Sequence, residues 1–301
     1  MKKLNKIITI ILIILIVFIL SFVGYIYYIL SSVSPNVNEN DENYLPAKEM
    51  DWNKKINIFL VGIDARYKDE MSRSDTNLLL SIDPKNEKIV IISLPRDTFV
   101  ELPGYEGHQK LAHAHSYGGV PLLIKTVENL LGIEIPFYVE VNFEGFTKMI
   151  DLIGGVTIEV EKDMNYESYL GDVKIHLKKG LQHLNGEKAL MYVRFRMDET
   201  ADIGRMERQQ KFLKALIEQS LKIENTIRLQ KVLIELKNWV KTNLEPWQII
   251  KLGVLLKTIE SDDIITMTLP GYPGWYSDGL SYYFLYSDKL EELINTYLKD
   301  E

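Results

Sequence analysis

The strongest constraint on this 301-residue chain is an uncharged stretch at residues 7–30, "IITIILIILIVFILSFVGYIYYIL". A helix rises about 1.5 Å per residue, so this stretch is long enough to cross a hydrocarbon core of about 30 Å. Lys2, Lys3 and Lys6 precede it, and positive charge stays on the cytoplasmic side of a membrane. We therefore expect residues 1–6 to form a cytoplasmic tail, residues 7–30 a transmembrane anchor, and the rest to be extracellular.

A cleaved signal peptide is the alternative interpretation of this stretch, but its apolar core would normally be only about 7–15 residues. The length favours a retained anchor and a single-pass protein of the cell membrane. Residues 31–54 are polar and contain Pro35 and Pro46, which indicates an extracellular linker. Residues 55–301 then form the extracellular domain.

Composition narrows the function of that domain. The chain is 46% hydrophobic and 26% charged, which is typical of a folded globular protein. It contains no cysteine, so disulfides and thiolate metal sites are excluded. With 35 Lys and Arg against 42 Asp and Glu, an extracellular protein of net charge −7 is a poor candidate for binding nucleic acid.

Short apolar runs alternate with helical patterns after residue 55. Runs that are apolar on both faces predict strands covered by helices on each side, so we expect a three-layer α/β/α sandwich with a central mixed sheet. Gly132 ends one predicted helix, and the glycine pair at 154–155 ends another. Pro246 begins a new helix, and Ser287 or Asp288 caps the last predicted helix. The predicted strands are 56–62, 77–82, 88–95, 137–143, 156–160 and 264–270, and the predicted helices are 120–132, 144–155, 204–259 and 287–299.

Arginine and aspartate occur together at three predicted strand ends. Ligands of open α/β sheets gather at strand ends, although each pair alone reads equally well as a surface salt bridge or a turn. The three pairs are Asp64 with Arg66, Arg73 with Asp75, and Arg96 with Asp97.

A second cluster of arginines lies in "YVRFRMDETADIGRMERQQ", residues 192–210. Arg194 and Arg196 point to one side if the segment is extended, and on the next helix Arg205, Arg208 and Gln209 share one face. Asp198 and Asp202 are placed to hold these arginines when no ligand is bound. The cluster is either a solvated, self-paired charged surface or a site for a polyanion.

The two groups together favour a phosphate site. Asp64 and Asp75 can hold Mg²⁺, which takes one or two carboxylates together with phosphate oxygens and water. One arginine side chain donates two parallel hydrogen bonds to two phosphate oxygens, and a pyrophosphate needs several arginines. Zinc is a weaker interpretation, because no carboxylate completes a ligand set with the histidines His108, His113 and His115, which we expect to flank an ordered loop around Lys110.

The chain resembles the LytR-CpsA-Psr family of cell-wall glycopolymer ligases over roughly residues 55–220. The segments that carry the resemblance occur in one order along the chain. They are "NIFLVGIDAR", "RSDTNLLLSID", "IVIISLPRDTFVELPGY", "KLAHAHSYGG", "VNFEGFTKMIDLIGGV", "GLQHLNGEKALMYVRFR" and "DIGRMERQQKFL".

The resemblance implies a membrane-anchored phosphotransferase with Mg²⁺ as cofactor. Such an enzyme moves a glycopolymer, of teichoic acid or capsular type, from a polyprenyl-pyrophosphate carrier to a muramyl hydroxyl of peptidoglycan. It places Asp64 and Asp75 near the metal, and Asp97 either orients Arg96 or assists proton transfer. Around the pyrophosphate it places Arg73, Arg96, Lys110, Arg194, Arg196, Arg205 and Gln209, and it makes Asp75, Arg96, Asp97, Arg194 and Arg196 the catalytic residues.

Two functions other than transfer use the same residues. A non-catalytic envelope receptor would bind polyprenyl phosphates without turnover, and a pyrophosphatase would let water replace the glycan acceptor. The chain departs from the family at Ala112, where many members have Asn, and at His113 and His115. These positions concern the acceptor side, where the segment "GYPGWYSDGLSYYF" at 271–284 is a candidate aromatic surface for glycan. The Leu- and Ile-rich stretch from 212 to 258 either binds a lipid chain or belongs to the core.

Overall fold

The computed structural model describes six stretches of the chain: 45–46, 48–64, 72–169, 173–198, 201–220 and 239–300. The predicted cytoplasmic tail, the predicted anchor and most of the predicted linker lie outside these stretches, as does Arg66. Among the helices that the six stretches contain, none is long and apolar enough to cross a bilayer.

A six-stranded mixed sheet forms the centre of the fold, in the order β11–β6–β1–β2–β3–β12. β1 runs parallel to β6 and antiparallel to β2, and β3 runs parallel to the edge strand β12. Phe59 and Leu79 in the middle of the sheet are fully buried, because helices cover both of its faces. The strands are β1 (Ile56–Ile63), β2 (Ser74–Asp83), β3 (Lys88–Ser93), β6 (Phe137–Asn142), β11 (Val240–Thr242) and β12 (Ile264–Thr268).

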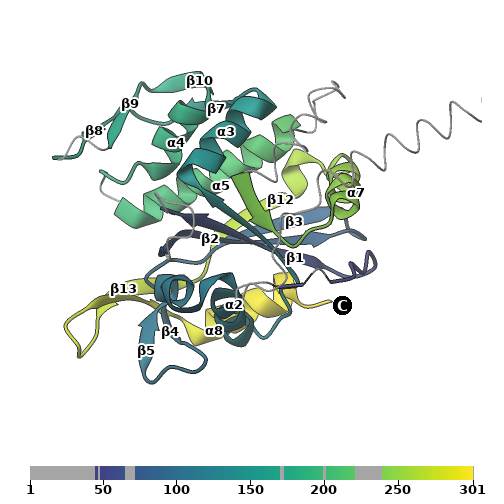
Figure 1. Ribbon diagram of the computed structural model, residues 1–301, viewed down its shortest axis with the longest axis vertical. Helices are drawn as coiled ribbons and strands as arrows, with labels where there is room; N and C mark the ends of the chain where they lie inside the picture. The colour runs from purple at the N-terminus through teal and green to yellow at the C-terminus, as the bar shows by residue number, and fades with distance from the viewer. Residues whose placement is uncertain are drawn as a thin grey trace, which may run out of the picture.

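Helices pack on the two faces of this sheet, as Figure 1 shows. On one face α2 and α8, with the π-helical turn η2, pack against Phe59, Leu79 and Ile92. On the other face α5 and α7 pack against Ile58 and Leu80. The α/β class with a central mixed sheet is therefore confirmed. The helices are α2 (Leu111–Leu131), α5 (Ala201–Ser220), α7 (Pro246–Leu256), α8 (Ser287–Leu293) and η2 (Ile294–Leu298).

A smaller hydrophobic core lies beyond α5, at the top of the view in Figure 1. Two helices and two antiparallel strand pairs, β7 with β10 and β8 with β9, bury Ile150, Val156 and Tyr192 against Phe212 of α5. This layer forms the far wall of the cavity described below. Its elements are α3 (Phe143–Ile153), β7 (Val156–Val160), β8 (Met164–Glu167), β9 (Lys174–Leu177), β10 (Gly180–Leu184) and α4 (Gly186–Arg194).

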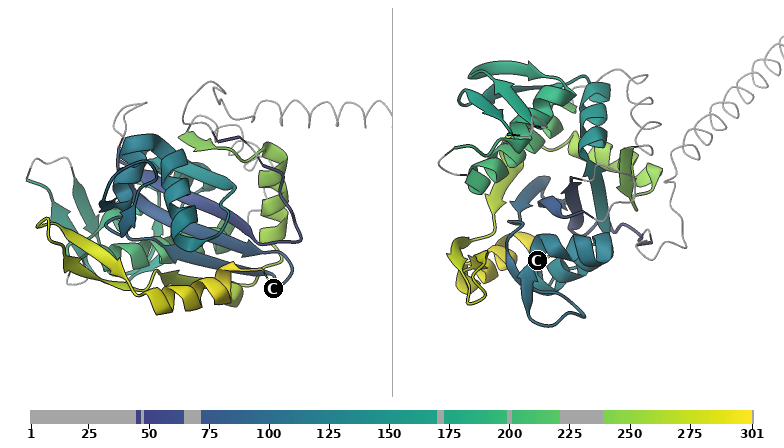
Figure 2. Two further views of the ribbon diagram at one scale, coloured as in Figure 1. Left: turned by 90° about the horizontal axis from the view of Figure 1, so that it is seen from below. Right: turned by 60° about the vertical axis from the view of Figure 1, so that its left-hand side comes forward.

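Two hairpins project from the opposite side of the sheet. They lie side by side in both views of Figure 2. An isolated bridge between Thr98 and Tyr283 joins them. The hairpins are β4 (Phe99–Glu101) with β5 (His108–Lys110), and β13 (Gly271–Trp275) with β14 (Ser281–Leu285); a short 3₁₀ turn, η1 (Ser261–Asp263), precedes β12.

Several predicted helix ends are confirmed by their geometry. Gly132 and Gly154 end α2 and α3 in the left-handed conformation, with φ of 65° and 102°. Pro246 is the first residue of α7, where its missing N–H costs no helical hydrogen bond.

The predicted helix 120–132 is present, but a helix that precedes it was not predicted and two other predictions about helices are wrong. α2 consists of two helices, one from Leu111 and one from residue 120, which are separated by a kink at the non-helical residues Gly118 and Gly119. The predicted helical stretch 204–259 is interrupted by strand β11 at the sheet edge, and its residues 221–238 lie outside the described part of the chain. The residue at the start of α8 is Tyr286, which makes no side-chain cap, so neither Ser287 nor Asp288 caps the helix.

Candidate functional site

A cavity of about 390 Å³ lies between the central sheet and the smaller core. Most of its wall is apolar and comes from β1, β2, β6, α3, α4 and α5, with side chains such as Leu78, Val141, Phe146 and Leu213. Its charged end is formed by side chains from five separate segments. These are Asp64, Asp75, Arg96, Arg194, Arg196, Arg205 and Gln209, all of which were predicted from the sequence.

The two predicted metal ligands come together because their strand ends are neighbours. Gly62 pairs with Thr76 whereas Ile63 pairs with Ser74, so Asp75 is the extra residue of a β-bulge beside the end of β1. A Cβ atom on Gly62 would lie 2.9 Å from the Thr76 Cβ, which explains the glycine at this position. The bulge directs Asp75 into the same cavity as Asp64.

Asp75 holds Arg96 through a hydrogen-bonded ion pair. The Arg96 Nη1 atom donates to the Asp75 Oδ1 atom at 2.6 Å, and its Nε lies 3.7 Å from Asp97 Oδ2. Burial disfavours the Arg96 charge, but the hydrogen bond to Asp75 and the charges of Asp202, Asp75 and Asp97 outweigh it and raise the pKa of Arg96. The Arg96 Nε is buried without a hydrogen-bond partner, so a further acceptor could bind there.

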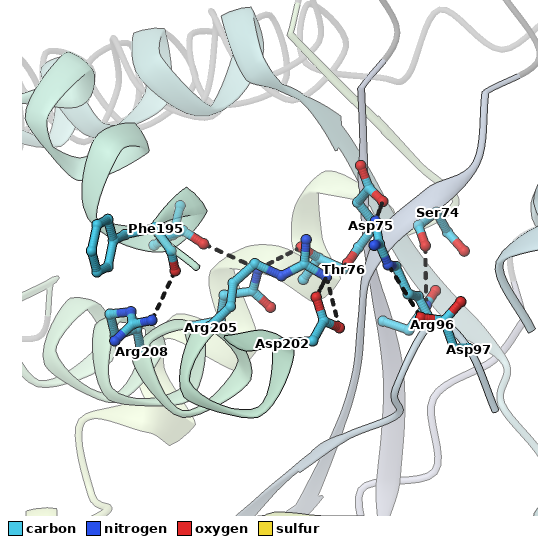
Figure 3. Close-up of polar contacts among 12 residues, drawn as sticks. Ser74, Asp75, Thr76, Arg96, Asp97, Phe195, Asp202, Arg205 and Arg208 are labelled. Carbon is cyan, nitrogen blue, oxygen red and sulfur yellow. Dashed lines mark hydrogen bonds and ion pairs between the residues drawn. The ribbon is translucent and has the colours of Figure 1, made fainter. Parts of the chain in front are cut away.

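Arg205 and Gln209 reach the cavity from α5. The Arg205 Nη2 atom donates to the Asp75 backbone carbonyl at 3.1 Å and lies 3.0 Å from Asp202 Oδ1, and Gln209 donates to the Thr76 hydroxyl at 3.0 Å (Figure 3). Burial lowers the pKa of Arg205, and the charges of Arg96 and Arg196 lower it further, although Asp202 and Asp75 oppose this. A buried arginine that is repelled by other arginines is typical of an anion-binding site.

Arg208 points the other way, although the prediction placed it on the same face. Its Nη1 atom donates to Asp198 at 2.8 Å and to Glu161 at 3.2 Å, and its Nη2 atom donates to the Phe195 carbonyl at 2.8 Å. Figure 3 shows Arg208 beside Phe195, further from Asp75 than Arg205 is. Arg208 therefore holds the backbone between Arg194 and Arg196 and is not part of the anion site.

Arg194 and Arg196 both line the cavity, but not from an extended segment. Arg194 is the last residue of α4, and its guanidinium lies 4.2 Å from the centre of the Phe143 ring. Phe195 is the first extended residue after the helix, so the chain turns there and Arg196 follows on the exposed side. The two side chains line the same cavity, and the expected backbone conformation at Arg194 is wrong.

Three predicted residues lie beside the cavity and do not line it: Arg73, Asp97 and Lys110. Lys110 Nζ is 2.8 Å from Asp97 Oδ1, so Asp97 lies between Lys110 and Arg96. Arg73 is exposed, and its charge acts on His113. Asp97 is therefore placed to orient the two cations, which is one of the two roles that the resemblance implied.

Sequence reasoning missed how the segment before Asp75 is held. His115 was expected beside a loop, but it lies inside α2, is 5% exposed, and makes two polar contacts with acceptors. Its Nδ1 lies 2.5 Å from the Ser72 carbonyl and its Nε2 lies 3.0 Å from Glu140 Oε2. Burial raises the pKa of Glu140, but the hydrogen bond with His115 and the charge of Lys241 outweigh it, so this pKa is lowered. His115 and Glu140 are 25 residues apart and lie on different elements, so a single sequence gives no signal of their contact.

The donor set suits a magnesium ion that binds together with substrate phosphate. Among the residues that the structure describes, no three His, Cys, Asp or Glu side chains gather as a metal cage. Asp64 and Asp75 supply two carboxylates at the charged end. Mg²⁺ usually takes one or two carboxylates, keeps some water and fills its remaining positions with phosphate oxygens.

Comparison with known proteins gives one consistent result. The model of the LytR_cpsA_psr family matches residues 24–299. Polyisoprenyl-teichoic acid–peptidoglycan teichoic acid transferase TagU of Bacillus cereus is 32% identical over 269 residues, covering 88% of this chain and 86% of that protein. The crystal structure of B. subtilis TagV has 32% identity and a TM-score of 0.72, covering 82% and 97% of the two chains. A structure of TagT bound to LIIa-WTA has 30% identity and a TM-score of 0.67, covering 87% and 96%.

Proposed function

The chain belongs to the LytR_cpsA_psr family, and on that premise we propose that it moves a cell-wall glycopolymer of teichoic acid type from a polyprenyl-pyrophosphate carrier to peptidoglycan. One observation carries the proposal: an apolar cavity whose charged end gathers four arginines against two aspartates. An amphiphile with an isoprenoid chain and a pyrophosphate matches both parts of this surface. The apolar wall binds the chain, and the arginine forks bind the phosphate oxygens.

The reaction breaks a phosphoanhydride bond and forms a phosphoester bond. A hydroxyl oxygen of the acceptor attacks the phosphorus that carries the glycopolymer, and the bond from this phosphorus to the bridging oxygen breaks. Polyprenyl monophosphate leaves, and the hydroxyl proton passes to a base or to water. Negative charge therefore grows on the leaving phosphate.

The arginines stabilise this charge. Arg96 pairs with Asp75, and a pyrophosphate at this end of the cavity would compete with Asp75 for Arg96. Arg205 lies behind the bulge and is repelled by Arg96 and Arg196, so an anion between the three relieves that repulsion. Arg194 lies over Phe143 and approaches the same end of the cavity.

Asp64 and Asp75 are the residues that would hold Mg²⁺, and the bound ion would supply positive charge to the phosphate oxygens. Release of Arg96 to the pyrophosphate frees Asp75 for this role. Asp97 keeps its ion pair with Lys110 and holds Lys110 and Arg96 at one side of the phosphate.

We also propose that residues 7–30 anchor the protein in the cell membrane, with the N-terminus in the cytoplasm and the domain outside. The first described residues pack on α7: Gln248 donates to the Lys48 carbonyl at 3.0 Å, and Lys251 Nζ lies 4.0 Å from the centre of the Trp52 ring. Protease added to intact protoplasts should degrade the domain. Complete protection would contradict the orientation.

Reconstitution tests the reaction and separates it from the two alternatives. Full-length protein in vesicles with a labelled lipid-linked glycopolymer should transfer label to added peptidoglycan oligomers. Release of label into water at the same rate with and without acceptor would indicate a pyrophosphatase. Binding of the donor without turnover in the presence of acceptor and Mg²⁺ would indicate a receptor.

A further inference from the structure

A cluster of aromatic rings adjoins the charged end of the cavity on the side of Asp97. Phe99, two residues after Asp97, stacks on His108 of the paired strand with 4.2 Å between ring centres and 6° between ring planes. Three rings of the C-terminal hairpin surround Phe99 at 4.8, 5.0 and 5.1 Å: Tyr276, Tyr282 and Phe284. We refer to these five residues as the aromatic platform. Within the aromatic platform the Tyr282 side chain is buried, whereas Tyr276 is 43% exposed.

The aromatic platform is fixed to the phosphate site by backbone and charge contacts. The backbone N–H of Tyr283 donates to the Asp97 carbonyl at 2.9 Å. Lys110 Nζ lies 5.6 Å from the centre of the Tyr282 ring and 2.8 Å from Asp97 Oδ1. The hydroxyl of Tyr282 donates to Asp278 at 2.7 Å, which fixes the ring from below. A ligand on the platform is therefore held at a fixed position relative to Arg96.

A second aromatic group lies near Lys110 on helix α2. Tyr117 is 5.2 Å from Tyr105 and 5.8 Å from His113 between ring centres, and we refer to these three residues as the tyrosine flank. Tyr105 is 47% exposed and Tyr117 is 42% exposed. Burial lowers the pKa of His113, and the charges of Arg73 and Lys110 lower it further, although the charge of Asp97 opposes this. The hydrogen bond of His113 with Gln109 at 3.0 Å fixes this ring.

We propose that the aromatic platform and the tyrosine flank bind the glycan strand of the peptidoglycan acceptor and present one of its hydroxyls to the phosphate at Arg96. This inference rests on the proposed transfer function and assigns the acceptor side of that site. A pyranose ring has a flat face of C–H bonds that packs on an aromatic ring, and hydroxyls at its edge that hydrogen-bond to polar groups. Tyr276, Tyr117 and Tyr105 offer such exposed rings, and Lys110 and Asp97 offer polar groups between them.

Charge and position favour a glycan over a membrane as the occupant. The hairpin of residues 271–285 carries a single charged side chain, Asp278, and no Lys or Arg that would attract anionic lipid. The hairpin also lies at the end of the molecule opposite α7, on which residues 48–52 pack (Figures 1 and 2). The chain that leads from the predicted anchor therefore enters at the far end from the aromatic platform.

Binding of glycan without donor tests the inference directly. Full-length protein in detergent is titrated with soluble peptidoglycan glycan strands, and Tyr276→Ala and Tyr117→Ala should each weaken binding about 10-fold. Tyr276→Phe keeps the ring and should bind normally. Trp247→Ala on α7 removes a ring of matched exposure, 44% against 43%, and should have no effect. In the transfer assay the two alanine variants should raise KM for acceptor by the same factor and leave KM for donor unchanged.

Three results would overturn the inference: wild-type protein that does not bind the strands, both alanine variants binding like wild type, or both losing affinity for phospholipid vesicles in place of glycan. Circular dichroism of each variant separates lost affinity from lost fold. A wild-type protein that binds glycan but transfers nothing would instead refute the proposed reaction, and the glycan site would stand.

Discussion

Two buried arginines one helical turn apart should respond in opposite ways to the same substitution. Arg205 and Arg208 lie on α5 and are 6% and 4% exposed. Methionine is a good helix former of similar length without charge, so Arg205→Met and Arg208→Met change little except the guanidinium. We expect Arg205→Met to lose transfer and keep stability, and Arg208→Met to lose stability.

The magnitude for Arg208 follows from its partners. It donates to Asp198, to Glu161 and to the Phe195 carbonyl, and the Asp198 side chain is 7% exposed. Removing one partner of a buried ion pair costs about 3–5 kcal/mol. Lys162 Nζ lies 3.4 Å from the same Asp198 oxygen and compensates part of the loss, so the low end, about 3 kcal/mol, is expected. For a domain of this size that lowers Tm by roughly 6–12 °C.

The change in unfolding free energy for Arg205→Met is small because the lost contacts and the relieved repulsion oppose each other. Methionine loses the ion pair with the partly exposed Asp202 and the hydrogen bond to the Asp75 carbonyl. It also removes the cost of burying a charge and the repulsion from Arg96. The net change in unfolding free energy should be within about 1 kcal/mol. Loss of one preorganised donor should reduce kcat about 100- to 1,000-fold.

Thermal unfolding followed by circular dichroism, together with the reconstituted transfer assay, measures both effects on full-length protein. Equal loss of Tm in the two variants would refute the division of α5 into an anion-binding and a structural face. Near-normal transfer by Arg205→Met would remove Arg205 from the pyrophosphate site.

Three further predictions concern Asp75, Glu140 and Gly62. Asp75→Asn keeps a side-chain oxygen but loses the charge, so its residual transfer should no longer depend on added Mg²⁺; an unchanged Mg²⁺ titration would exclude Asp75 as a ligand. The pKa of Glu140 is lower in the folded protein than its ordinary value of 4.5, so its contribution to stability is present above pH 4.5 and is lost as the pH falls through the lowered value. Glu140→Gln should therefore flatten the acid limb of the stability profile measured by urea unfolding, and a profile identical to wild type would contradict this. Gly62→Ala should cost about 1–3 kcal/mol in the same assay, because the new methyl group meets Thr76 at 2.9 Å; stability like that of wild type would show that the bulge accommodates it.

Much of the fold could be predicted because its signals are local. The buried runs of β1 and β3 are largely apolar on both faces, the run of β6 alternates between apolar and polar residues, and Gly132 and Gly154 end their helices where a left-handed residue is needed. β11 could not be predicted, since three residues of strand inside a helical pattern are specified by pairing with β6 and not by their own sequence. The helix that begins at Leu111 was not predicted, and the non-helical residues Gly118 and Gly119 separate it from the predicted helix that begins at residue 120.

The sequence predicted which residues line the site, but not the direction in which each side chain points. The side chains that line the charged end were identified because strand ends meet at one edge of a sheet. Helical spacing alone placed Arg208 beside Arg205, but the carboxylates of Asp198 and Glu161 on the other side of α5 decide where it points. The contact of His115 with Glu140 depends on tertiary packing between α2 and β6, which no spacing within one element reveals.

The order of strands in the sheet also sets a condition on how the protein is made. Both outer strands, β11 and β12, come from residues 240–268, whereas the four strands between them are complete by residue 142. A chain that emerges with its N-terminus first therefore presents an inner sheet with two unpaired edges while about a hundred further residues are still to come. Such edges are templates for pairing with other chains. Nascent protein truncated before residue 240 should aggregate or require a chaperone, and completion of β11 and β12 ends that exposure.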